Sequence, residues 1–192
     1  MPYYVRLMHQ EDVSQVTGID REAFPTMLPP ANFRREMDSP LAHYIVVCEE
    51  KGQAAPTGTE VNKNGEQPVV GFAGFWLMAG EAHIVNLAVR QPYRRQGIGE
   101  LLLISLIELA VEMEASLITL EVRASNAGAR RLYGKYGFTD RGLRRRYYSD
   151  NREDAVIMTV DDISSPLYHL KLNELKKEHS DRWGASLYQI VP

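Results

Sequence analysis

The chain has 192 residues, of which 44% are hydrophobic and 24% are charged, a composition typical of one soluble globular domain with space for an appendage. Its net charge of −3 argues against a protein that coats nucleic acid, and DNA is not expected as a partner. The single cysteine excludes an internal disulfide and a multi-cysteine zinc site. No segment resembles a signal peptide or a membrane span, so we expect a cytoplasmic protein that does not bind membranes.

Charge is distributed unevenly along the chain. Residues 90–152 hold twelve Lys or Arg and seven Asp or Glu, a net charge of +5, so the remainder carries −8. A basic block in an acidic protein indicates a site for an anionic ligand, although a solvated basic surface is the commoner explanation of such a count.

The first half of the chain predicts short elements separated by proline and glycine. Weak alternation over residues 3–8 predicts a strand, and apolar spacing over 11–24 predicts a helix that the following prolines end. A short helix is predicted over 32–37. Three strands follow at 44–48, 69–78 and 82–89, with a long loop over residues 50–68 between the first two.

The second half begins with a strong helix over 100–114, whose polar stripe is Ser105, Glu108 and Glu112. The remaining elements are a strand at 117–122, a helix at 127–136, strands at 138–141 and 155–160 around an Arg- and Tyr-rich hairpin, and an appended polar helix at 167–178. Strands mixed with crossover helices predict an α/β or α+β sheet with helices on its faces, in the order β-α-α-β-β-β-α-β-α-β-β.

A glycine-rich turn joins the strand at 82–89 to the strong helix. In Arg94-x-x-Gly97-x-Gly99 the missing Cβ atoms allow backbone N–H groups to approach a ligand, and the first helical turn has unpaired N–H groups with partial positive charge. Such a turn favours a phosphate or diphosphate, with Arg94 and Arg95 adding charge. A tight turn without a ligand would also explain the glycines alone.

Several motifs together resemble the GNAT superfamily of acetyl-CoA-dependent N-acetyltransferases. They are the Arg-x-x-Gly-x-Gly turn, Asn86-Leu87-Ala88-Val89 before it, Leu120–Asn126, Leu132–Phe138 and Arg146-Tyr147-Tyr148 followed by Glu153-Asp154-Ala155. Within that superfamily they are most similar to RimI-type ribosomal-protein-alanine and archaeal Ard1-type N-terminal acetyltransferases. The resemblance implies a GNAT domain over 1–162 with a central mixed, mostly antiparallel twisted sheet and helices on both faces. Residues 163–192, a part-helical extension, have no counterpart.

The resemblance implies acetyl-CoA as cosubstrate and no metal. In this family the phosphates of coenzyme A bind the turn, here Arg94, Arg95, Gln96, Gly97, Ile98, Gly99 and Glu100. The backbone of Leu87, Ala88 and Val89 would pair with pantetheine and polarise the thioester. Asn126, by preference a helix N-cap, would also bond the pantetheine arm.

Two residues carry the chemistry that the resemblance implies. Glu121, on a strand whose neighbours Leu120 and Val122 point to the other face, would be the general base; an ion pair with Arg123 is the structural alternative. Tyr133 would be the general acid that protonates the departing sulfur. Its helical spacing also fits a core aromatic, and a core ring whose hydroxyl reaches the site would satisfy both.

The acceptor side is implied in the same way. Tyr147 and Tyr148 would line the entrance for a peptide N-terminus, opposite Phe24, Met27 and Leu28, while the adjacent arginines would contact peptide acids or the ribosome. The expected reaction is acetylation of a protein α-amine, in its narrow form an N-terminal alanine of a small-subunit ribosomal protein. A small-amine acetyltransferase and a non-catalytic coenzyme A or RNA-binding module are the alternatives. The oligomeric state is not predicted.

The histidines lack metal-ligand spacing, so His83 and the others are expected in surface or structural roles. Cys48 is expected in the core rather than as a nucleophile.

Overall fold

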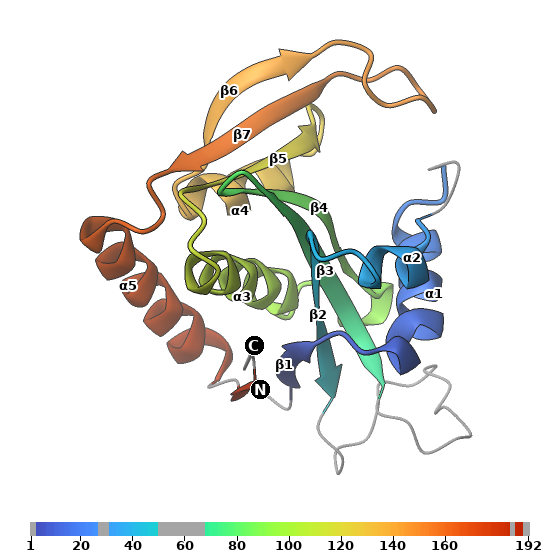
Figure 1. Ribbon diagram of the computed structural model, residues 1–192, viewed down its shortest axis with the longest axis horizontal. Helices are drawn as coiled ribbons and strands as arrows, with labels where there is room; N and C mark the ends of the chain where they lie inside the picture. Colours follow the sequence, from blue (N-terminus) through green and yellow to red (C-terminus); the bar gives the residue numbers. More distant parts are fainter. Residues whose placement is uncertain (1–2, 27–30, 50–67, 185–186, 190–192) are drawn as a thin grey trace.

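One mixed sheet forms the centre of the computed structural model, which describes residues 3–26, 31–49, 68–184 and 187–189 (Figure 1). Across the sheet the strands lie in the order β6 (Thr139–Arg144), β7 (Ala155–Asp161), β5 (Leu117–Arg123), β4 (Glu81–Val89), β3 (Val69–Met78), β2 (Ala42–Glu49), β1 (Tyr3–Leu7) and β8 (Leu187–Gln189). Only the pairs β4–β5 and β1–β8 are parallel. The predicted mixed, mostly antiparallel sheet is therefore confirmed.

Helices cover both faces of this sheet, as predicted. They are α1 (Val13–Ala23), α2 (Phe33–Met37), α3 (Ile98–Glu112), α4 (Ala127–Lys135) and α5 (Pro166–Trp183), with short 3-10 turns at Gln10–Asp12 and Gln91–Tyr93. Side chains of a strand point alternately to its two faces. Accordingly Ile45 and Val47 of β2 join the core under α3, whereas Val46 and Cys48 join a second core under α1 and α2. None of the described helices is long and apolar enough to cross a membrane.

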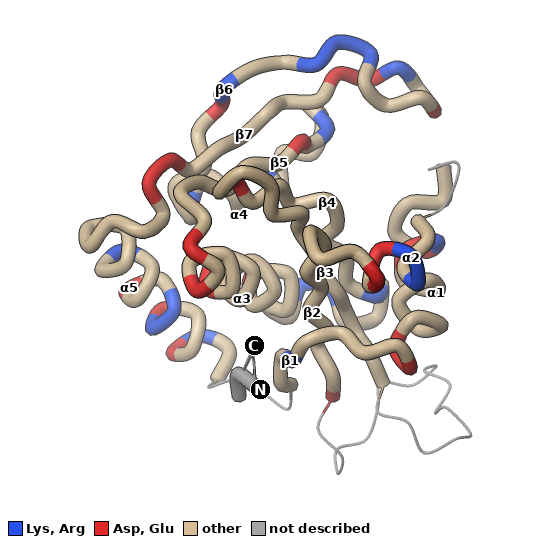
Figure 2. Tube along the Cα trace, viewed as in Figure 1, with Lys and Arg blue, Asp and Glu red and all other residues tan. Residues whose placement is uncertain are grey.

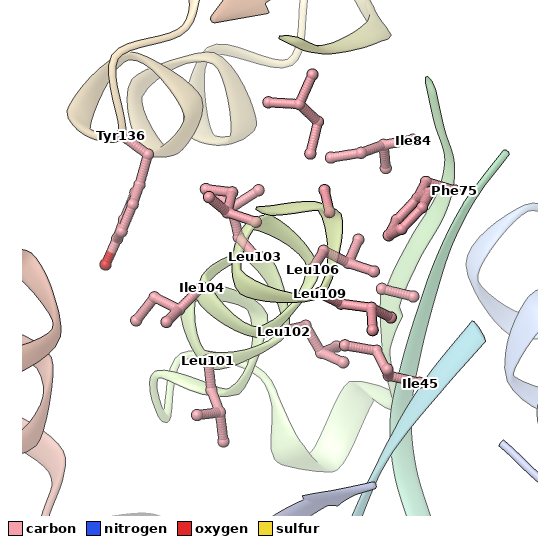
Figure 3. Packing of buried hydrophobic residues seen from close by; sticks show 14 of the residues in the cluster. Ile45, Phe75, Ile84, Leu101, Leu102, Leu103, Ile104, Leu106, Leu109 and Tyr136 are labelled. Atoms are coloured by element: carbon pink, nitrogen blue, oxygen red, sulfur yellow. The ribbon is translucent and has the colours of Figure 1, made fainter. Parts of the chain in front are cut away.

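Helix α3 lies between the sheet and α5 (Figure 1), and leucine and isoleucine side chains surround it on all sides (Figure 3). The predicted polar stripe is therefore partly wrong. Ser105 is fully buried, and its hydroxyl donates to the Leu101 carbonyl at 2.9 Å. Of the other two, Glu108 forms an ion pair with Lys176 of α5 and Glu112 is exposed. A second helix, α5, packs on the outer side of α3, so part of the face that sequence periodicity assigned to solvent lies against protein.

The segment after residue 162 is more ordered than predicted. Helix α5 begins at the N-cap Ser165, whose side chain accepts from the Tyr168 N–H, and ends at Gly184, which has a φ of +87°. Strand β8, which sequence analysis did not predict, then pairs with β1 in parallel. The division into a domain over 1–162 and an extension stays a prediction, and most of the loop over 50–68 lies outside the described residues.

Candidate active site

The two central parallel strands pair over a short stretch only. Register between β4 and β5 runs from Glu81 opposite Leu117 to Ile84 opposite Leu120, whereas β4 stays paired with β3 as far as Val89. Beyond Ile84 the two strands diverge (Figure 1), so the edge of residues 85–89 that faces β5 has no strand partner in the described structure. This is the segment, Leu87 to Val89, that the sequence predicted to pair with an extended ligand.

The predicted phosphate-binding turn lies at the N-terminus of α3. Gly97 is the N-cap, with a left-handed φ of +79° and no side-chain cap, so the first-turn N–H groups of α3 have no intrahelical acceptor. Arg95 is also left-handed, at φ +64°. No ion pair is found for Arg94 or Arg95 within the described residues. Backbone donors and two cations without an ion pair among the described residues suit a diphosphate.

Neighbouring elements fix the shape of this turn. Arg94 donates from Nε to the Val89 carbonyl at 2.9 Å, which leaves the rest of its guanidinium for a ligand. Gln96 accepts from the Tyr3 hydroxyl at 3.1 Å and donates to the Pro92 carbonyl at the same distance. Glu100 accepts from Lys135 at 2.9 Å, so this acidic side chain, predicted to touch coenzyme A, is neutralised within the protein.

Glu121 sits on β5 close to the point where β4 and β5 diverge. Its side chain is only 9% exposed, and both oxygens are engaged: Oε2 with His83 Nε2 at 2.5 Å and Oε1 with Arg144 Nε at 2.9 Å. His83 lies opposite Thr119 in the register, so its ring reaches diagonally across the strand pair. The hydrogen bond from His83, opposed by burial and helped by Arg144, holds the pKa of Glu121 below its ordinary value.

The alternative partner for Glu121, Arg123, is excluded. The Arg123 guanidinium instead binds Asp150 at 2.8 Å and Glu153 at 3.3 Å, both in the loop between β6 and β7. Its central carbon also lies 3.9 Å from the centre of the Tyr148 ring, a cation–π contact that holds this ring in place. Arg123 therefore orders the hairpin and leaves Glu121 to His83 and Arg144.

Tyr133 is half-buried on the α4 side of the core, with its ring 5.7 Å from that of Phe138. Burial, reinforced by Tyr148, raises the pKa of Tyr133 to about 12. Burial likewise raises the pKa of Tyr148 to about 12, and the nearby Glu121 acts in the same direction. Tyr148 therefore lies near both Tyr133 and Glu121.

Asn126 caps α4 as predicted, because its side-chain oxygen accepts from the Ala129 N–H at 3.1 Å. Its amide N–H₂ group remains available as a donor.

The two segments predicted to enclose the acceptor are brought together. The Thr26 hydroxyl, just after α1, donates to Asp150 in the β6–β7 hairpin at 2.6 Å. Phe24 packs against the core under α1 and α2, while Tyr147 is 48% exposed with its ring 5.3 Å from that of Tyr148. Met27 and Leu28 lie outside the described residues.

The basic block divides in space rather than forming one patch. Lys and Arg lie along the β6–β7 hairpin and, separately, near the start of α3 (Figure 2). Many are neutralised internally: Arg130 binds Asp140 at 2.8 Å, Arg141 forms an ion pair with Asp161, and Arg144 binds Glu121. This arrangement gives little support to a continuous RNA-binding surface.

His83 is the site residue that sequence analysis missed. It was assigned a surface or structural role because the histidines lack metal-ligand spacing, and its partner Glu121 lies on another strand, 38 residues away. Within the part of the chain that the structure describes, no three His, Cys, Asp or Glu side chains gather in a way that could hold a metal ion. Cys48 is buried, as predicted, and burial raises the pKa of its thiol.

Comparison with known proteins agrees with this geometry. The sequence profile of the "Acetyltransferase (GNAT) family" matches residues 14–138. A Bacillus subtilis protein named, provisionally, as a [ribosomal protein bS18]-alanine N-acetyltransferase is 38% identical over 157 residues, which cover 81% of this chain and 93% of that protein. The Escherichia coli K12 [ribosomal protein bS18]-alanine N-acetyltransferase is 41% identical over 103 residues, covering 53% and 68%.

A solved structure gives the same likeness in three dimensions. The crystal structure of the ribosomal-protein-S18-alanine N-acetyltransferase from Escherichia coli superposes with a TM-score of 0.65 and 27% identity, covering 83% of this chain and 94% of that one.

Proposed function

Because this chain belongs to the acetyltransferase (GNAT) family, we propose that it transfers the acetyl group of acetyl-CoA to the N-terminal α-amine of a protein, and that its acceptor is an N-terminal alanine of a small-subunit ribosomal protein. The arrangement that carries the reaction is the carboxylate of Glu121, held beside the divergence of β4 and β5 and below the tyrosines of the β6–β7 hairpin. The acceptor class rests on the activities for which the relatives are named.

The chain's own groups suit acetyl-CoA. First-turn N–H groups of α3, with Arg94 and Arg95, would hold the diphosphate, and the Asn126 amide would bond the pantetheine arm. The free edge of residues 87–89 would align the arm as an added strand and leave a backbone N–H to polarise the thioester carbonyl. Bound in this way, acetyl-CoA supplies the activated acyl group.

Glu121 would act as the base, with His83 as its partner. A peptide α-amine has a pKa of about 8 and must lose a proton before it attacks. A carboxylate with a lowered pKa is ionised and ready, but it retains a proton poorly, so the proton needs an onward acceptor. Solvent would be that acceptor: the His83 ring, which is hydrogen-bonded to Glu121 at 2.5 Å and has a side chain 30% exposed, favours the ionised carboxylate and so the release of the proton once Glu121 has taken it from the amine.

Tyr133 would act as the acid. With a pKa of about 12 its phenol stays protonated at neutral pH, and the proton is available to the thiolate as the carbon–sulfur bond breaks. Starting from its ammonium form, the amine loses one proton before attack and a second as the amide forms, both through Glu121 to solvent. The leaving sulfur takes one proton from Tyr133, which regains it from solvent, so each cycle releases one proton net.

A peptide panel tests this function. Purified protein is mixed with acetyl-CoA and peptides that begin with Ala, Ser or Met, and thiol release is followed together with the mass of the peptide. We expect turnover with free N-termini, fastest with Ala, and none when the same peptides carry blocked N-termini and an internal lysine. Turnover on a free small amine but on no N-terminal peptide would overturn the acceptor. Binding of coenzyme A without any turnover would overturn catalysis.

Variants test the assignment of the base. Glu121→Gln should lower kcat by roughly 10²-fold while coenzyme A still binds, because general base catalysis is lost and the phosphate turn is untouched. Glu112→Gln, which removes an exposed carboxylate at the end of α3, is the matched control and should turn over as wild type. Equal rates for Glu121→Gln and wild type would exclude Glu121 as the base.

A further inference from the structure

We propose that α5 forms part of the acetyl-CoA site, where His179 and Trp183 act as positioning residues that hold the phosphate turn over residues 94–99 in its binding conformation. This rests on the proposed function, since it assumes that the turn binds the diphosphate of coenzyme A. The family profile ends at residue 138, and α5 lies well beyond it.

His179 contacts the backbone of the turn directly. The residue is 2% exposed, and its Nε2 lies 3.0 Å from the Gly97 carbonyl oxygen. A carbonyl only accepts hydrogen bonds, so Nε2 carries the hydrogen. The same oxygen accepts the N–H of Leu101 at 2.9 Å, the bond that begins α3. His179 therefore fixes the peptide group whose orientation sets where the first free N–H groups of α3 point.

Trp183 also lies against this glycine. A Cβ on Gly97 would fall 2.7 Å from Cδ1 and Cγ of the indole, so ring and backbone are in direct contact. The indole Nε1 is buried and has no hydrogen-bond partner among the described residues. An unpaired buried donor is costly, and an anionic oxygen at the turn would satisfy it. Arg182 stacks on the indole, with its central carbon 4.9 Å from the ring.

Contacts on both sides of the turn keep α5 in place. Lys176 forms an ion pair with Glu108 of α3, and Lys135 of α4 bridges Glu100 at 2.9 Å and Glu178 at 3.3 Å. After α5, β8 pairs with β1, the strand whose Tyr3 hydroxyl holds Gln96. The turn is thus held from β1 on one side and from α5 on the other, as the adjacency of α5, β8 and β1 illustrates (Figure 1).

If α5 positions the phosphate turn, its contacts should affect the binding of acetyl donors that carry a diphosphate and not of donors that lack one. Acetyl-pantetheine has the reactive thioester and the arm but no diphosphate, so it reports on the β4–β5 region alone. Loss of the hydrogen bond from His179 should therefore weaken the binding of coenzyme A and acetyl-CoA, and leave the kinetics with acetyl-pantetheine unchanged.

The experiment compares His179→Ala, His179→Gln and Trp183→Phe with Lys177→Ala, an exposed control on the same helix. Calorimetric titration with coenzyme A gives binding without turnover, and steady-state rates are measured with acetyl-CoA and with acetyl-pantetheine. His179→Ala should weaken coenzyme A about tenfold and raise KM for acetyl-CoA similarly, with kcat within about twofold. His179→Gln retains an N–H donor and should recover most of the affinity. Trp183→Phe keeps an aromatic ring but loses the indole N–H donor, so it should weaken the binding of coenzyme A about threefold or more.

Two results would overturn the proposal. One is an unchanged affinity for coenzyme A in both His179→Ala and Trp183→Phe, measured on variants whose melting temperature equals that of wild type. The other is an equal loss of kcat/KM with acetyl-CoA and acetyl-pantetheine, which indicates a general loss of structure. If wild type binds coenzyme A with this dependence on α5 but acetylates no N-terminal peptide, the proposed function fails while the role of α5 stands.

Discussion

Replacing Gly97 with alanine measures how tightly the phosphate turn and α5 fit together. The new methyl would sit in a left-handed backbone at φ +79° and within 2.7 Å of the Trp183 ring. Gly99, two residues later, provides the control. A methyl there would have no neighbour closer than 3.9 Å, in a backbone without positive φ.

The expected loss combines two costs. A left-handed conformation costs an L-residue about 1–2 kcal/mol relative to glycine. An extra methyl forced into filled space costs about 1–3 kcal/mol, here towards the lower end because the indole lies near the end of α5 and has some freedom to shift. The free energy of unfolding of Gly97→Ala should therefore fall by about 2–4 kcal/mol, which for a chain of this size lowers Tm by roughly 5–15 °C.

Thermal unfolding followed by circular dichroism, with urea titration at equilibrium, checks these values. Gly99→Ala should be at least as stable as wild type, because alanine in a helix gains about 0.5–1 kcal/mol over glycine. If Gly97→Ala has the same Tm as wild type, or if both variants lose the same free energy of unfolding, the contact between Gly97 and Trp183 does not constrain the turn.

Four further outcomes are expected. Tyr133→Phe should lower kcat by about 10²-fold with little change in coenzyme A affinity, since the ring keeps its packing and only the proton donor is lost; single-turnover kinetics separate the two. His83→Leu removes the group that most lowers the pKa of Glu121, so that pKa rises and the acid limb of the pH–rate profile should move to higher pH; an unmoved limb would exclude the pair. Hydrogen bonds from Ser125 lower the pKa of Glu153 to about 2, so its contribution to stability is present above its ordinary value of 4.5 and lost as pH falls towards 2. Glu153→Gln should therefore reduce Tm at pH 7 and leave it unchanged near pH 2. Thr26→Val breaks the link between α1 and the hairpin, and should raise KM for peptide more than for acetyl-CoA, as initial rates at varied peptide would show.

Local patterns in the sequence were sufficient for most of the fold. Alternation placed Glu121 on the face opposite Leu120 and Val122, and the structure confirms that face because a strand has a period of two residues. The cap at Asn126 followed from side-chain chemistry within one turn of helix. These predictions depend on contacts only a few residues apart, which is the range over which sequence periodicity is informative.

Features set by long-range packing were missed. His83 meets Glu121 only through the parallel register of β4 and β5, which no local pattern specifies. Ser105 is fully buried in the packed structure, so its solvated position in the predicted stripe was wrong. Strand β8 consists of three residues and owes its conformation to the edge of β1.

The pairing of β8 with β1 also has a consequence for biosynthesis. Residues 4 and 187 are partners in the sheet, so this pairing closes a loop that contains every other described strand, and its entropic cost is met only after residue 187 has left the ribosome. The helix that reaches the phosphate turn emerges in the same late stretch. During translation the sheet from β2 to β7 can assemble first, while the turn at Gly97 still lacks its contacts with α5. A nascent chain would therefore acquire its full affinity for coenzyme A only once α5 has emerged, and ribosome-bound fragments of increasing length would show this as a single step in ligand binding at that point rather than a gradual rise.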